Sequence, residues 1–448
     1  MIQRLIDFLN ASPVNFLAVR NVAKVLDNAG YERIDMGDAM PEMKAGKRFY
    51  TIKNDSSLFA FEIGTRPMAE AGMHIIAAHS DSPTFRIKPS AEIACQGGIV
   101  KLNTEAYGGS ILNTWLDRPL SIAGRVIVKG QDIMHPESRL LHVKRPLLSI
   151  PNLSVHLNKQ MNEGIKLSKQ KDMLPILGII SDELEKENML LAVVSKEAGV
   201  AIEDILDFDL YLYDTTPACL WGMHEEFISS GRLDDLSMVH AGLEALIDPG
   251  ESEATKVLAV FDNEEVGSKT KQGAGNIFLA SIMQRIVLAQ GGTLDDYYRM
   301  IEKSFLVSAD NAHAWHPNYN EKYDPTNHPK MGGGPVIKYN AAQKYVSDAY
   351  SAAVFAGICK EAGVPYQTFV NNSEVAGGST LGNILSASLP LSGVDMGAPM
   401  WAMHSIRETE NVQDHEYCIK AFTHFYLYST RACSSRYASG SQRKSSTR

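Results

Sequence analysis

The chain has 448 residues, of which 44% are hydrophobic and 21% are charged, a composition typical of a globular protein and not of a disordered one. Its 43 lysines and arginines are outnumbered by 52 aspartates and glutamates, which leaves a net charge of -9. Because no basic stripe interleaved with aromatic residues is present, the chain is not expected to bind nucleic acid. Its length allows two domains.

The cysteines and the N-terminus bear on the compartment. The five cysteines lie far apart without a C-x-x-C pair, so neither a disulfide framework nor a thiolate zinc site is indicated, and buried thiols in a reducing compartment are expected. Arg4 and Asp7 interrupt the apolar core that a secretory signal needs, and no apolar run approaches the roughly 20 residues that span a bilayer. We therefore expect a cytoplasmic protein without membrane contact.

The N-terminal half predicts helices, then strands, then a change of character. The first 34 residues have the pattern of two amphipathic helices, the second of which opens near Ser12-Pro13 and stops at residues 28–30. Three strands are predicted next, at residues 48–53, 57–64 and 73–83. Further on, the chain carries glycine pairs and short β-like segments such as residues 121–130 and 153–157. We predict that residues 86–214 form an inserted β-rich domain.

From residue 215 onward, strand-like segments alternate with helical patterns. The strands are expected at residues 256–261 and 304–308, and the helices at residues 236–247 and 345–363. This alternation predicts an α/β fold in which a mainly parallel central sheet carries helices on both faces. The main domain would comprise residues 1–85 and 215–433, and residues 434–448, which have almost nothing to bury, are expected to be a disordered tail.

Polar side chains end or follow several of these apolar segments. In open α/β sheets, ligands bind beyond the carboxyl ends of the strands, so polar residues there are candidates for chemistry. His79 and Asp81 are two residues apart and lie on one face of an extended chain. In chain order the candidates are His79, Asp81, Asp234, Asp235, Glu264, Glu265, Asp310 and His404.

Taken singly, each candidate has an ordinary structural explanation. An aspartate before a helix is typically an N-cap, a lone histidine is typically a hydrogen-bonded core residue, and Asp310 suits a turn. Taken together, two imidazoles and four carboxylates would meet at one edge of one sheet, where burying unpaired acids costs several kcal/mol per charge. A divalent metal resolves this conflict. Nitrogen and oxygen ligands without thiolates favour zinc, with manganese or cobalt as alternatives.

These candidates lie in longer motifs that resemble those of one family. The motifs are, in chain order, "DFLNASPVNFLAVRNVAKVLDNAGY", "HSDSP", "YGGSILNTWLDRPLSIAGRV", "GRLDDL", "DNEEVGS", "SADNAHAWHPN", "GGGPVIKYN", "GGSTLGNI" and "MHSIRE". Over almost the whole chain they are similar to the aspartyl-aminopeptidase-type zinc metallopeptidases. The resemblance implies a zinc-exopeptidase-like fold and two Zn²⁺ per subunit.

The resemblance also implies roles for six of the candidates. Asp234 would bridge both metals, His79 and Asp310 would complete one zinc site, and Glu265 and His404 would complete the other. Glu264 would be the general base for the water that the metals activate. Asp81 is expected to accept a hydrogen bond from the His79 ring and to fix its tautomer.

Candidate substrate residues are less well defined. The segment "HPKMGGGPVIKYN" lacks the G-K-[ST] ending of a phosphate loop. In similar enzymes the lysine at the position of Lys338 lies near the substrate, where it could pair with an acidic side chain; the alternative is a solvated lysine after a loop. Glu374 stands where the family has an aspartate. His156, His313 and His316 are candidates for substrate binding, for contact with a neighbouring subunit or for the core.

The expected function is that of a zinc-dependent aminopeptidase that acts on small peptides and prefers N-terminal Asp or Glu. Similar proteins assemble through the inserted domain into dimers and then tetrahedral homododecamers. One alternative is a two-metal deacylase or amidohydrolase acting on a non-peptide substrate. Another is a non-catalytic metal-binding scaffold, although such a scaffold would have lost the base or a ligand, and all six positions are present here.

Overall fold

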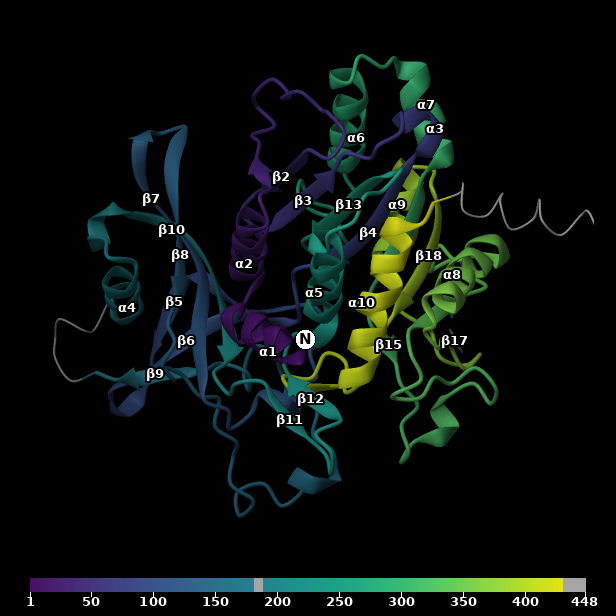
Figure 1. The fold of residues 1–448 in the computed structure, drawn as a ribbon. Helices are drawn as coiled ribbons and strands as arrows, with labels where there is room; N and C mark the ends of the chain where they lie inside the picture. Colours follow the sequence, from purple (N-terminus) through teal and green to yellow (C-terminus); the bar gives the residue numbers. More distant parts are fainter. Residues whose placement is uncertain (181–187, 430–448) are drawn as a thin grey trace, which may run out of the picture.

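The structure is a computed structural model that describes residues 1–180 and 188–429, so the predicted tail at 434–448 lies outside the described residues. It confirms a mixed α/β architecture with several sheets, which contain nine, six and five strands (Figure 1). The nine-stranded sheet has the order β1-β2-β3-β13-β4-β14-β18-β16-β17. Its strands are β1 (Glu32–Arg33), β2 (Arg48–Lys53), β3 (Ser57–Glu62), β4 (Met73–His79), β13 (Thr255–Phe261), β14 (Phe305–Ala309), β16 (Val336–Tyr339), β17 (Gln367–Val370) and β18 (Ser392–Gly397).

The middle of this sheet is parallel. β13, β4, β14 and β18 lie side by side and run in the same direction, whereas β3 is antiparallel to β13 and β16 is antiparallel to β18. Every residue of β13 is buried, as expected for a strand covered on both faces. The carboxyl ends of the four parallel strands therefore meet at one edge, and there Phe261 pairs with His79.

Helices cover both faces of the nine-stranded sheet, because successive strand residues point to opposite sides. Along β4, Ile76 and Ala78 enter one apolar core, and Ile75 and Ala77 enter the other. The first core is covered by α1 (Ile2–Ala11), α2 (Asn15–Asn28), α5 (Leu233–Ile247), α8 (Ala349–Ala362) and α10 (Val412–Leu427). The second is covered by α3 (Met68–Ala71), α6 (Phe278–Ala289), α7 (Leu294–Lys303) and α9 (Leu381–Ser388).

Several helix boundaries follow from local signals in the sequence. The two N-terminal helices are confirmed, with a break between Ala11 and Asn15. Asp348 caps α8 and forms a reciprocal capping box with Ser351. The same helix stops at Gly363, whose φ of 64° is a left-handed conformation that glycine adopts without strain. No helix within the described ranges has both the length and the apolar character that crossing a membrane requires.

Residues 84–214 contribute a separate antiparallel sheet with its own apolar core, on the left in Figure 1. Its strands are β5 (Thr84–Ala94), β6 (Ile99–Tyr107), β7 (Leu120–Asp132), β8 (His135–His142), β9 (Ile176–Ile179) and β10 (Ile205–Asp214), joined by the helix α4 (Met189–Ala198). The β-like prediction for residues 153–157 is wrong. This segment forms no strand and pairs with none among the described residues, and Leu153, Val155 and Leu157 are all exposed.

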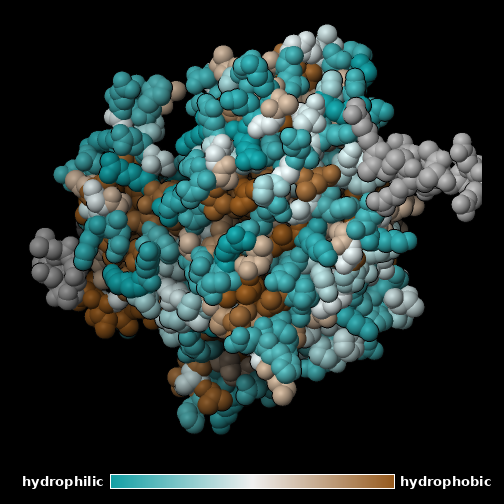
Figure 2. All heavy atoms as spheres, viewed as in Figure 1, coloured by the Kyte–Doolittle hydropathy of each residue, from teal (hydrophilic) through white to brown (hydrophobic). Residues whose placement is uncertain are grey.

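The third sheet has five strands. It has the order β11-β12-β20-β19-β15, and β11 and β12 are labelled at the lower centre of Figure 1. Its strands are β11 (Cys219–Trp221), β12 (Phe227–Ser230), β15 (Ala312–His313), β19 (Pro399–Trp401) and β20 (Glu408–Asn411). On the surface, hydrophobic residues are visible at the left side of the molecule, over the six-stranded sheet (Figure 2). Ile179 and Leu206 are among its exposed apolar side chains.

Candidate metal centre

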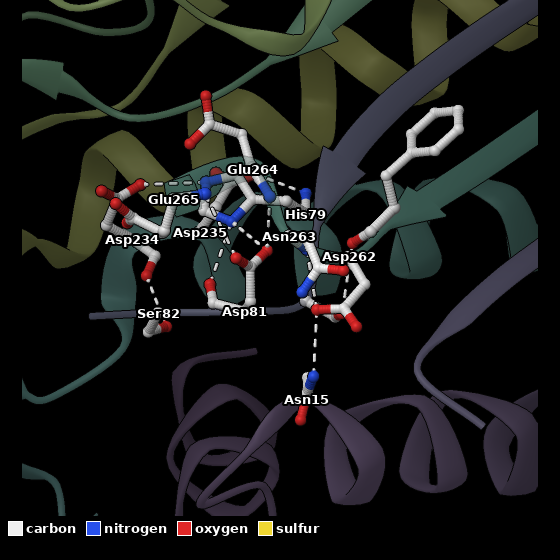
Figure 3. Close-up of polar contacts among 12 residues, drawn as sticks. Asn15, His79, Asp81, Ser82, Asp234, Asp235, Asp262, Asn263, Glu264 and Glu265 are labelled. Carbon is white, nitrogen blue, oxygen red and sulfur yellow. Dashed lines mark hydrogen bonds and ion pairs between the residues drawn. The ribbon is translucent and has the colours of Figure 1, made fainter. Parts of the chain in front are cut away.

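One pocket of about 520 Å³ lies at the carboxyl edge of the parallel strands. β4 ends at His79, β14 is followed by Asp310, and α5 brings Asp234 in its first turn. The six residues predicted as metal ligands and general base all line this pocket: His79, Asp234, Glu264, Glu265, Asp310 and His404. Figure 3 shows how closely those from β4, α5 and the segment after β13 approach one another.

The two adjacent glutamates reach the pocket from a turn, not from the strand itself. β13 ends at Phe261, and Asn263 has a φ of 61°, a left-handed conformation that asparagine tolerates better than most residues. Residues Glu264–Val266 then form one 3₁₀ turn. Because the strand has ended, the two side chains do not point to opposite faces of the sheet, and both line the pocket.

Asp234 lies between the two histidines. Its Oδ1 is 3.7 Å from His79 Nε2, and its Oδ2 is 3.4 Å from His404 Nε2. His404 Nε2 is also 3.2 Å from Glu265 Oε1. Potential ligand atoms of Asp234, Glu265 and His404 all lie within 4.8 Å of one another.

Buried acid oxygens in this cluster fit a bound cation. Asp234 Oδ1 and Glu265 Oε1 are buried and have no hydrogen-bond partner among residues 1–180 and 188–429. A buried carboxylate oxygen that accepts no hydrogen bond costs several kcal/mol, which coordination to a cation removes. Imidazole nitrogens and carboxylate oxygens are ligands that suit zinc.

The charges of the cluster shift its ionisation strongly. Burial, together with the Asp310 and Glu265 carboxylates and against the opposite effect of His79, raises the pKa of Glu264 to about 9. Burial by itself would lower the pKa of His404, but Asp234 and Glu265 raise it to about 12. The shift of His404 reflects the neighbouring negative charge, whereas the shift of Glu264 reflects burial first.

Asp310 reaches the pocket but is paired with a lysine. Lys338 Nζ donates a hydrogen bond of 2.8 Å to Asp310 Oδ1. Lys338 is only 2% exposed, so the alternative of a solvated lysine is wrong. Burial would lower the pKa of Lys338, but the Asp310 charge outweighs burial and raises it. The buried ammonium is therefore held beside a predicted metal ligand.

Asp81 makes different contacts from those that the sequence suggests. The closest partner of the His79 ring is the Asp81 main-chain carbonyl, 2.9 Å from Nδ1, whereas the carboxylate Oδ1 is 3.5 Å away. The carboxylate instead accepts the N–H groups of Glu264 at 3.1 Å and Glu265 at 3.2 Å (Figure 3). Asp81 thus holds the backbone of both glutamates.

Two further acids support the site: Asp235, a candidate to which no role was assigned, and Glu408, which was not predicted for it. Asp235 Oδ2 accepts the N–H of His79 at 3.0 Å. Glu408 accepts the N–H of His404 at 2.7 Å with Oε1 and that of Asp234 at 3.1 Å with Oε2. The N-cap residue of α5 is Arg232, so Asp234 and Asp235 lie in the first turn of the element and not at its N-cap. Glu408 closes the motif "MHSIRE", which was the available signal in the sequence.

The predicted substrate residues fall into two groups. His313 lines the pocket, and its ring packs edge-on against Phe369 at 6.0 Å. His316, which packs on Tyr319 at 4.9 Å, and the exposed His156 are not among the residues that line it. Glu374 is likewise exposed and outside the pocket lining, although Gly378–Thr380, just after it, line the pocket.

Comparison with known proteins gives a consistent result. The model of the family "Aminopeptidase I zinc metalloprotease (M18)" matches residues 8–426. A "Probable M18 family aminopeptidase 2" from Clostridium acetobutylicum is 51% identical over 424 residues, which cover 95% of this chain and 98% of the relative. A protein of the same name from Ectopseudomonas mendocina is 43% identical over 429 residues, which cover 95% of this chain and 98% of that protein.

Solved structures agree with the sequence relatives. A chain in the structure of the Ape4 and Nbr1 complex is 34% identical in sequence to this chain and superimposes with a TM-score of 0.91. The match covers 95% of this chain and 85% of that one. The S. cerevesiae mApe1 dodecamer is 26% identical with a TM-score of 0.82, and the match covers 98% of both chains. The chain therefore belongs to the M18 family of zinc metalloaminopeptidases.

Proposed function

We propose that the protein removes N-terminal residues from small peptides, with two zinc ions as cofactors and Glu264 as the general base. One observation carries this proposal: the Glu264 carboxylate and the group formed by Asp234, Glu265 and His404 line the same pocket. Manganese or cobalt could replace zinc at ligands of this type.

The proposed ligand roles follow the geometry of Asp234. Its two oxygens face different histidines, which supports a bridging role. His79 and Asp310 would complete one metal site, and Glu265 and His404 would complete the other. Two divalent cations held there would lower the pKa of a water molecule and stabilise the negative charge that develops on the scissile carbonyl oxygen.

The proposed base is held in place by its neighbours. The Glu264 N–H donates to Asp81 Oδ1, which fixes the backbone, and the residue lines the pocket. Burial raises the pKa of Glu264, the direction that makes a carboxylate a stronger base. Glu264 would take a proton from the attacking water and pass it to the leaving amine.

We further propose a preference for N-terminal Asp or Glu. Its support is Lys338, whose buried ammonium belongs to the pocket lining. His313 also lines the pocket and could contact the substrate. For His156 and His316 the proposal is weaker in support, because neither lines the pocket of its own chain; His156 would have to act in the pocket of another copy.

The proposed domain organisation assigns assembly to residues 86–214. The catalytic domain would comprise residues 1–85 and 215–433, and the inserted domain would build dimers and then a tetrahedral homododecamer. Support comes from the separate core and exposed apolar residues of the six-stranded sheet, and from the dodecameric relative mApe1. The described cysteines are unpaired, which suits the proposed cytoplasmic location.

Two variants test the mechanism. Glu264→Gln should keep its metal yet lose about 10²–10⁴-fold in turnover, because only the proton acceptor is removed. Asp234→Ala should lose metal, because both sites share that carboxylate. Metal analysis and rates on aminoacyl-anilides, with N-acyl amino acids as the comparison substrates, decide the matter. A Glu264→Gln enzyme with near-normal turnover, or faster cleavage of the N-acyl amino acids, would contradict the proposal.

A further inference from the structure

A tyrosine from the six-stranded sheet enters the hydrogen bonds behind the proposed catalytic glutamates. β6 ends at Tyr107, whose hydroxyl donates to Asp81 Oδ2 at 2.7 Å. The same carboxylate accepts the N–H groups of Glu264 and Glu265. Tyr107 is thus one hydrogen bond away from the group that holds both glutamates.

The direction of the Tyr107 hydrogen bond is fixed by its surroundings. Asn263 Oδ1 accepts hydrogen bonds from Thr270 Oγ1 and Gln272 Nε2, each at 2.8 Å, which determines the orientation of the amide. Asn263 Nδ2 therefore donates to the Tyr107 oxygen, at 2.8 Å. Since the phenol oxygen accepts from Asn263, its single proton is left for Asp81.

Tyr107 remains a donor over the whole neutral range. Burial raises the pKa of Tyr107, and the nearby Asp81 and Asp262 carboxylates raise it further. Asp81 is itself buried, and its carboxylate, when ionised, accepts hydrogen bonds and donates none. Loss of the phenol proton would leave one of its oxygens without this short, charge-assisted bond.

We infer that Tyr107 is a positioning residue for the aminopeptidase reaction: its hydroxyl fixes the Asp81 carboxylate and, through it, the backbone that aims Glu264. This inference rests on the proposed function of Glu264. It gives the six-stranded sheet a part in catalysis in addition to the assembly role proposed above.

Tyr211 provides a matched control. It lies on β10, is partly buried like Tyr107, and its ring packs edge-on against that of Tyr107 at 5.7 Å. Among the described residues, the hydrogen bonds of the Asp81 carboxylate come from Tyr107, Glu264 and Glu265 and not from Tyr211. Tyr211→Phe therefore removes an equivalent hydroxyl from the same aromatic pair without touching Asp81.

The experiment compares zinc-loaded Tyr107→Phe and Tyr211→Phe full-length enzymes. We expect Tyr107→Phe to lower kcat by about 10–100-fold, the usual effect of losing a partner that orients a metal-site residue. Its KM should stay within about twofold of wild type, its zinc content should be unchanged, and Tyr211→Phe should keep wild-type kcat. The variables measured are kcat, KM, zinc content and thermal midpoint.

A double variant tests whether Tyr107 acts through Glu264. In a Glu264→Gln background, Tyr107→Phe should lower kcat by a further factor of less than about two, because the effects of residues that work as a unit do not add. The inference is overturned if Tyr107→Phe keeps wild-type kcat, if both phenylalanine variants lose kcat equally, if zinc is lost, or if Tyr107→Phe slows the Glu264→Gln enzyme by its full factor. The rate of Glu264→Gln alone tests the proposed function separately.

Discussion

Lys338 carries a buried ammonium group that lies among acidic and aromatic side chains. It bonds to Asp310 at 2.8 Å and lies 5.6 Å from the centre of the Tyr345 ring. The buried Asp395 carboxylate adds to the negative charge around it. An ammonium in such surroundings stays charged, and under the proposed acidic preference it would hold Asp310 and also attract the carboxylate of the substrate.

We predict that Lys338→Met weakens cleavage of N-terminal Asp and Glu more than that of Leu or Ala. In this variant the substrate carboxylate would be desolvated without a partner. The kcat/KM for acidic substrates should therefore fall by about 10–100-fold or more relative to that for neutral substrates. A specificity profile over the four N-terminal residues measures this ratio. Losing Asp310's partner should also lower all four rates together.

Lys330→Met is the matched control for this prediction. Lys330 is exposed, lies in the same glycine-rich segment and is not among the residues that line the pocket. Its substitution changes the net charge equally but should leave the profile unchanged. Equal loss for all substrates in Lys338→Met would refute the acidic preference and leave the aminopeptidase assignment intact.

At the scale of elements, α5 and α10 are joined by a buried pair of histidines. His240 Nδ1 and His415 Nε2 are 3.0 Å apart, and neither side chain reaches solvent. Burial lowers the pKa of His415 to about 3 and also lowers that of His240. Both rings are therefore neutral in the folded protein near neutral pH, and one donates to the other.

This pair predicts a loss of stability in acid. His415 binds a proton below about pH 6.5 in the unfolded chain, but only below about pH 3 in the folded chain. The contribution of the neutral ring to the free energy of unfolding is therefore fully present above about pH 6.5 and decreases as the pH falls towards about 3. The free energy of unfolding should fall by up to about 1.4 kcal/mol per pH unit for each such histidine. The fall in thermal midpoint between pH 7.5 and 5.5 should therefore be smaller in His415→Gln than in wild type.

Other groups face the histidines and must be held constant. Glu410 Oε1 is 3.9 Å from His415 Nδ1, and Glu244 Oε1 is 3.5 Å from His240 Nε2. Burial raises the pKa of Glu410 to about 8, which acts with the opposite sign because the folded state then binds the extra proton. Replacing the exposed His135 by Gln gives a control with these groups intact. The same pH dependence in all three proteins would exclude the buried pair as a cause.

At the scale of the whole molecule, the two larger sheets meet at the candidate metal centre. The loop after β6 brings the Gly109 carbonyl to 3.2 Å from His404 Nδ1. At the adjacent Gly108, φ is +72° and a Cβ would lie 3.2 Å from that of Glu265, so glycine permits this approach. The six-stranded sheet therefore contributes backbone groups as well as Tyr107 to the surroundings of the site.

We predict that the native protein is far heavier than the 49.2 kDa chain. Exposed apolar residues on the six-stranded sheet need covering, and the relative mApe1 is a dodecamer. Light scattering on the active enzyme measures the mass, and enclosed sites should favour short peptides over long ones. A fully active monomer would contradict the prediction.

The fold was predictable as far as local patterns reach. Apolar runs such as that of β13 and the cap and stop signals of α8 are written in neighbouring residues, because burial and backbone capping act over a few positions. The segment at 153–157 has a strand-like composition but no partner strand, and composition alone cannot provide one.

By itself the sequence determined the strand-end residues, such as His79 and Asp310, and the motifs of the family. Only the tertiary structure decided which residues hold them in place. The Tyr107 hydroxyl donates to Asp81, and Glu408 accepts the N–H groups of Asp234 and His404. The physical reason is that a hydrogen bond depends on which distant elements pack together. Periodicity records whether a side chain is buried and carries no information about the partner that it meets there.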